Sequence, residues 1–155
     1  MRKWGRKSSK VYSEVHPVLQ HYLDRVLQEV ADISLICGHR GQAEQDEAYE
    51  DGFSKVRWPN GAHNQLPSLA VDLQPYPKPR HTHKMYQALG YIGGRLVQMA
   101  AEDGIIIRWG GDWDRDGDIL DQTFDDLFHF EIVDVKSAEK IYSSNILTGG
   151  VRNGS

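Results

Sequence analysis

The chain has 155 residues and an ordinary apolar content, which suits one domain with a buried core. Its net charge of −4 gives no basic footprint for nucleic acid and no polybasic patch for a membrane surface, so we expect neither partner. The single cysteine, Cys37, excludes an internal disulfide, and no apolar run is long enough to span a membrane.

The first part of the chain predicts one long helix among short elements. Residues 1–12 are expected to form an extended basic lead-in, without the apolar core of a signal peptide. Apolar residues then recur at helical spacing from about Glu14 to Val30. The apolar run Ile33–Cys37 predicts a strand, and a short polar helix ending at Gly52 follows the turn after it.

The second part predicts further strands around a second long helix. The run 69–73 predicts a buried strand, and the Pro-rich stretch 74–83 predicts an exposed loop. Helical spacing continues over 84–103, and Ile105–Ile107 predicts another buried strand. We therefore expect a single α+β domain over residues 1–155. A small, mainly antiparallel sheet would carry the two long helices on one face, and residues 137–155 would be a partly frayed tail.

A candidate metal site begins in the stretch GAHNQLPSLAVDL. Asp72 lies among apolar residues of the predicted strand, where an ionised carboxylate is costly unless it is paired or bound to a metal. His63 precedes it by nine positions, on the far side of a Pro-Ser turn, so a return of the chain can bring imidazole and carboxylate together. Zinc takes such nitrogen and oxygen ligands, but two are too few.

The third ligand is expected from the stretch DDLFHFEIV. Its apolar residues alternate with period two, which predicts a strand with His129 on the face opposite to them. Three protein ligands, His63, Asp72 and His129, would leave a fourth position for water, as in catalytic zinc sites. Asp126, three residues before His129, is the candidate base for that water.

The stretch DWDRDGD resembles the first half of a calcium loop. Four aspartates occupy alternate positions and glycine stands sixth, namely Asp112, Asp114, Asp116 and Asp118 with Gly117. The twelfth position is Thr123 rather than glutamate, and no pair of helices flanks the loop. This incomplete match favours a solvated acidic turn over a calcium site.

Arg40 stands at the end of the first predicted strand, just before a helix. This is a common place for a substrate-binding side chain. A surface ion pair with Glu44 or Glu47 is the alternative, and position alone favours it.

Taken together, HNQLPSLAVDL, WGGDW and DDLFHFEI resemble the family of zinc D-alanyl-D-alanine carboxypeptidases and L-alanyl-D-glutamate peptidases, in particular its phage endolysins. The resemblance covers about residues 33–133. It implies that His63, Asp72 and His129 hold one zinc ion and that Asp126 is the catalytic acid and base. It also implies that Arg40 steadies the substrate or the oxyanion.

Two features depart from the family. A serine often stands two residues before the first histidine, where this chain has Gly61, and the interval to the aspartate is longer here. Ser54 or Ser68 would have to replace that contact.

The pocket is expected between the 53–60 loop, the Pro-rich loop and the segment from Trp109 to Trp113. Both tryptophans are candidate lining residues, with core packing favoured for one of them.

The resemblance implies hydrolysis of a peptide bond in the stem peptide of bacterial peptidoglycan, with the L-alanyl-D-glutamate bond expected. A D-alanyl-D-alanine carboxypeptidase and a non-catalytic metal-binding module for cell walls are the alternatives. We further expect a monomer that is made in the host cytoplasm without a signal peptide and acts on the cell wall.

Overall fold

The computed structural model describes residues 1–147 of the chain. Its elements in order are α1 (Arg6–Glu14), α2 (Pro17–Glu29), β1 (Ile33–Cys37), α3 (Gln42–Glu50), the short 3-10 helix η1 (Ala62–Asn64), β2 (Ala70–Pro75), α4 (Thr82–Glu102), β3 (Ile107–Gly110), β4 (Asp126–Ile132), α5 (Val135–Ile141) and the π-helical turn η2 (Tyr142–Ile146). The expected tail therefore begins as helix, and its residues 148–155 lie outside the described part.

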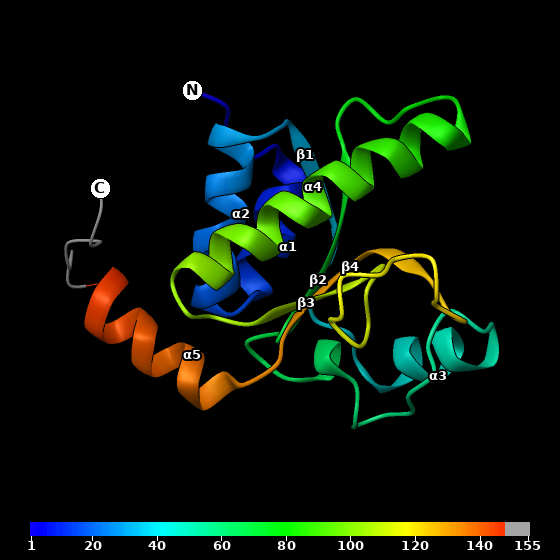
Figure 1. Cartoon of the computed structure of the whole chain (residues 1–155). Coiled ribbons are helices and arrows are strands. Elements are labelled where there is room, and N and C mark those ends of the chain that lie inside the picture. Colours follow the sequence, from blue (N-terminus) through cyan, green and yellow to red (C-terminus); the bar gives the residue numbers. More distant parts are fainter. Residues whose placement is uncertain (148–155) are drawn as a thin grey trace.

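The four strands form one antiparallel sheet in the order β1-β2-β4-β3. In Figure 1 the helices α1, α2 and α4 lie on one side of this sheet, and α3 lies on the other. The expected α+β architecture with a small antiparallel sheet is confirmed. One face of the sheet is thus closed by helices, which leaves the other face for a site.

The core lies between the sheet and the two long helices. Leu19, Leu23 and Val26 of α2 are fully buried, as are Leu89 and Leu96 of α4. These positions recur at three- and four-residue intervals, so each helix turns one apolar stripe toward the sheet. No helix in the described residues has both the length and the apolar character that crossing a membrane requires.

The extended lead-in expected over residues 1–12 is wrong, because α1 occupies most of that segment. Trp4 Nε1 and the Tyr12 hydroxyl donate hydrogen bonds of 2.9 and 2.7 Å to the carboxylate of Asp24 on α2. The hydroxyl of buried Ser8 accepts from the backbone N–H of Leu35 on β1, at 3.0 Å. These contacts depend on α2 and β1, so the local sequence, with its exposed basic face, gave little sign of the helix.

The sequence predicts a strand over Ile105–Ile107, whereas the observed strand β3 begins at Ile107. Pairing with β4 starts at Ile107, opposite Ile132, and continues through Arg108 and Trp109. Because side chains alternate along a strand, Arg108 and Trp109 lie on opposite faces of the sheet. This shift decides which of them reaches the site.

Close packing of α4 on β3 depends on Gly93. A Cβ added at Gly93 would lie 2.6 Å from Trp109 Cε2, whereas one added at Gly94 would have no heavy atom within 4 Å. We expect Gly93→Ala to lower the free energy of unfolding by about 1–3 kcal/mol through overpacking. Gly94→Ala should raise it by up to about 1 kcal/mol through helix propensity. Urea denaturation of both variants tests this, and equal effects would contradict the packing described.

Candidate metal centre

His63 is held at the site by two backbone contacts, one through its carbonyl oxygen and one through its ring nitrogen Nδ1. It lies in η1 and is buried, with its carbonyl oxygen accepting from the N–H of Arg40 at 2.8 Å. Its Nδ1 lies 2.7 Å from the carbonyl oxygen of Gly38. A carbonyl oxygen only accepts, so Nδ1 carries the proton and Nε2 offers its lone pair to the site.

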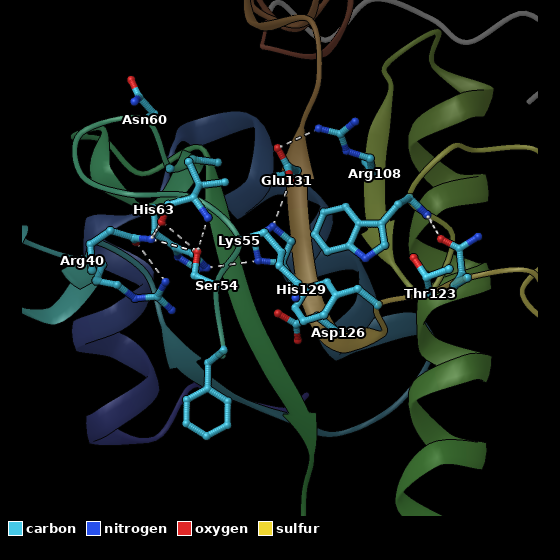
Figure 2. Close-up of a pocket in the computed structure, with 18 residues that line it drawn as sticks. Arg40, Ser54, Lys55, Asn60, His63, Arg108, Thr123, Asp126, His129 and Glu131 are labelled. Carbon is cyan, nitrogen blue, oxygen red and sulfur yellow. Dashed lines mark hydrogen bonds and ion pairs between the residues drawn. The ribbon is translucent and has the colours of Figure 1, made fainter. Parts of the chain in front are cut away.

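The sheet register places the other two candidate ligands. Asp72 on β2 and His129 on β4 are directly opposed partners, so their side chains project from the same face. Asp72 Oδ1 lies 3.2 Å from His63 Nε2 and 3.2 Å from His129 Nδ1, and the two nitrogens are also 3.2 Å apart. The structure therefore brings together the three side chains that the sequence singled out. Figure 2 shows two of them, His63 and His129, at the cavity.

The triangle of three atoms fits a small divalent cation. Zinc bonds of about 2.0–2.1 Å at tetrahedral angles separate neighbouring ligand atoms by roughly 3.3–3.4 Å, close to the spacing found here. Two imidazole nitrogens and one carboxylate oxygen are also ligands that zinc prefers. Cys37 is a further neighbour that the sequence did not indicate, since its sulfur lies 3.9 Å from His63 Nδ1 and it can join His63 and Asp72 in a metal-sized group.

At the three candidate ligands, interactions with neighbouring groups together outweigh the effect of burial on each pKa. Burial is the largest single effect on His63 and lowers its pKa, but the hydrogen bonds and charges of Asp72 and Cys37 together outweigh burial and raise the pKa of His63 to about 10. The pKa of His129 is raised in the same way, by Asp72 and Glu131 against burial. Burial also acts against ionised Asp72, yet the two imidazoles hold its pKa well below the usual range. The three groups together favour bound positive charge, whether it comes from protons or from a metal ion.

Asp126 stands at the first position of β4 and lines the cavity beside the triangle. Its carboxylate can form a metal-sized group with Asp72 and His129, in which the three ligand atoms all lie within 4.8 Å of one another. Burial and the nearby charge of Asp72 raise the pKa of Asp126. A carboxyl of raised pKa near a metal-sized gap suits proton transfer.

Arg40 lies between the candidate metal site and α3, and its guanidinium contacts both. Its Nη2 lies 3.7 Å from Asp72 Oδ2, and its Nη1 donates to Gln45 Oε1 at 3.1 Å. The ion pair with Glu44 or Glu47 that position alone favoured is therefore not the one that forms. Arg40 reaches the cavity wall with its guanidinium held on both sides.

The cavity at the site has a volume of about 510 Å³. The expected 53–60 loop contributes to its wall, together with Trp113 and the segment 122–124. Residues 74–83 do not line it, contrary to expectation, because β2 leads that loop away from the site. The Lys55 ammonium lies 5.0 Å from the ring centre of Phe124, so the 53–60 loop and the segment 122–124 contact each other.

Two residues that were expected to line the cavity are buried in the interior instead. Trp109 lies on the core face of β3, is buried, and donates from Nε1 to the carbonyl oxygen of Leu127 at 2.7 Å. Ser68 is fully buried, and its hydroxyl lies 2.7 Å from the carbonyl oxygen of Ala70 and 3.0 Å from that of Gly38. Ser54, by contrast, does line the cavity.

Glu131 and Arg108 are site residues that the sequence reasoning missed. Glu131 Oε1 lies 3.0 Å from His129 Nε2, and Arg108 Nη2 lies 3.3 Å from Glu131 Oε2. The signal for Glu131 was present, because a strand residue two positions after His129 projects from the same face.

The acidic loop folds on itself. Asp112, Asp114 and Asp116 bring carboxylate oxygens within 4.8 Å of one another, and Asp118 lies outside this group. Their oxygens accept from loop N–H groups, such as that of Gly117 to Asp112 Oδ2 at 3.0 Å. An acidic turn makes such contacts, and the preference for a solvated turn over a calcium site of Asp112, Asp114, Asp116 and Asp118 stays a prediction.

Comparisons with known proteins point to one family of enzymes. A family model described as phage L-alanyl-D-glutamate peptidase matches residues 1–133. The L-alanyl-D-glutamate peptidase of Escherichia phage T5 is 28% identical over 121 residues, covering 77% of this chain and 88% of that protein.

Among solved structures, the Serratia marcescens L-Ala D-Glu endopeptidase ChiX has the same fold. The match has a TM-score of 0.61 at 24% identity and covers 86% of this chain and 91% of that one. The family resemblance drawn from the sequence motifs is confirmed, because the family model spans most of the chain. The protein is a member of the phage L-alanyl-D-glutamate peptidase family.

Proposed function

We propose that this peptidase uses one zinc ion, held by His63, Asp72 and His129, to cleave the bond between L-alanine and D-glutamate in the stem peptide of peptidoglycan. The observation that carries the zinc assignment is the triangle of two nitrogens and one oxygen with equal sides of 3.2 Å. The family assignment supports the choice of bond.

Asp126 is the proposed acid and base. A zinc ion bound by the three ligands would polarise the scissile carbonyl and lower the pKa of water beside it. Asp126 accepts the proton of the attacking water and returns it to the leaving amine. The raised pKa of Asp126 brings it closer to neutral pH, where both transfers are effective.

Arg40 is the proposed electrostatic partner of the substrate. Its guanidinium lies on the cavity wall and pairs with Asp72 through one nitrogen, while its charge faces the same space as Asp126. A fixed guanidinium there can donate to a carbonyl oxygen that becomes negative, or to a substrate carboxylate. All five groups come from one chain, so we also propose that the enzyme acts as a monomer on the cell wall.

Digestion of purified peptidoglycan, followed by mass spectrometry of the fragments, tests the proposed bond. We expect new amino termini on D-glutamate, and we expect chelator to abolish them and added zinc to restore them. Release of free D-alanine alone would instead indicate a carboxypeptidase. Binding to cell walls without any cleavage would indicate a non-catalytic module, and either result would overturn the proposal.

A further inference from the structure

We propose that Glu131, braced by Arg108, is a positioning residue that presents His129 Nδ1 to the metal. This inference rests on the zinc site proposed above. It gives a role to Glu131 and Arg108, which line the cavity but take no part in the hydrolytic mechanism proposed above.

The proposed relay consists of Asp72, His129, Glu131 and Arg108. It crosses three adjacent strands. Asp72 on β2 opposes His129 on β4, and Glu131 on β4 opposes Arg108 on β3. His129 and Glu131 are two positions apart, so both project from the site face of the sheet. Backbone pairing therefore places Asp72, His129, Glu131 and Arg108 on one face of the sheet. Figure 2 shows His129, Glu131 and Arg108 joined by their contacts in that order.

The two ring nitrogens of His129 have different neighbours. Nδ1 lies 3.2 Å from Asp72 Oδ1 and 3.2 Å from His63 Nε2, at the metal-sized triangle. Nε2 lies 3.0 Å from Glu131 Oε1. A neutral imidazole has one N–H and one lone pair, and an ionised carboxylate only accepts. Glu131 therefore places the proton on Nε2 and leaves the Nδ1 lone pair for the metal.

Geometry argues against Glu131 as a second base. The imidazole ring of His129 separates the Glu131 carboxylate from the triangle, because Glu131 contacts the nitrogen that faces away from it. The side chain of Glu131 is only 15% exposed, and its other oxygen lies 3.3 Å from Arg108 Nη2. A carboxylate held between His129 and Arg108 is suited to orient the imidazole rather than to act on water at the triangle.

Arg108 and Trp113 complete the support. The Arg108 guanidinium lies 5.7 Å from the Trp113 ring centre, and that ring lies 5.3 Å from the His129 ring. Arg108 thus offsets the charge of Glu131, and the indole limits rotation of the imidazole. His63 Nδ1 instead contacts the carbonyl oxygen of Gly38 at 2.7 Å and the sulfur of Cys37 at 3.9 Å, so the two histidines are fixed by different means.

Zinc affinity, measured by competition with a chromophoric chelator, tests the relay. Mutation of a residue that hydrogen-bonds to a metal ligand typically lowers metal affinity by about 10–100-fold. We therefore expect the zinc affinity of Glu131→Ala to fall by that factor. Glu131→Gln keeps an acceptor oxygen and should recover most of the loss. Glu139→Ala is the matched control, because Glu139 Oε1 lies 3.1 Å from Nε2 of His16, which is not a proposed ligand.

Unchanged zinc affinity in Glu131→Ala, with the native protein binding zinc, would overturn the relay alone. Failure of the native protein to bind zinc would overturn the proposed function instead. Long-range proton–nitrogen NMR of the zinc-loaded native protein gives a test that needs no variant. We expect a proton on His129 Nε2, and a proton on Nδ1 with metal on Nε2 would contradict the assignment.

Discussion

Replacing Asp126 with alanine is expected to lower the rate of peptide-bond hydrolysis by about 10²–10⁴-fold, the usual contribution of a general acid and base. Zinc content should stay the same, because the three proposed ligands keep their contacts with one another. The rate is measured on purified cell walls or a synthetic L-alanyl-D-glutamyl peptide, and zinc is measured by elemental analysis of the same samples.

Asp125→Ala provides the control for this experiment. Asp125 is the adjacent carboxylate and is exposed to solvent, so its loss changes the net charge equally without touching the site. We expect its activity to match that of the native protein. Full activity in Asp126→Ala would remove Asp126 from the mechanism, and loss of zinc in that variant would make it a ligand rather than a base.

Replacing His63 with alanine is expected to abolish both zinc binding and hydrolysis. His63 supplies one of three proposed ligand atoms, is buried, and leaves a gap that no other imidazole of the described residues fills. Two remaining ligands hold zinc poorly, since catalytic sites use three from the protein. Zinc content and cell-wall hydrolysis, measured together, should fall together.

An exposed histidine separates this effect from a general loss of imidazole. His83, in the first turn of α4, is exposed, and His83→Ala should retain both zinc and activity. Circular dichroism of His63→Ala checks that the fold persists. Stoichiometric zinc in a folded His63→Ala protein would contradict the ligand assignment.

Local pattern and chemistry were enough to find the triangle. A carboxylate in an apolar strand, Asp72, and a period-two strand carrying His129 each indicated a constrained polar group. The register that joins them, with Asp72 opposite His129, is what one antiparallel sheet produces. The same alternation carried the unused signal for Glu131.

The remaining errors came from contacts between distant segments. Trp109 and Trp113 were both candidate lining residues, with core packing favoured for one, and the continuation of β3 beyond Ile107 places Trp109 in the core. Helix α1 is held by Asp24 and Leu35, which its own residues do not reveal. The nearness of Cys37 to the site results from pairing between β1 and β2, where Cys37 opposes Asp72.

The nearness of Cys37 also provides the most direct test of the central claim, because thiolate and imidazole ligands differ in bond length. X-ray absorption at the zinc edge of the purified protein measures those bonds. Coordination by His63, Asp72 and His129 predicts one zinc per chain with only nitrogen and oxygen neighbours, at about 2.0–2.2 Å. A sulfur neighbour at about 2.3 Å, or the absence of bound zinc, would contradict it.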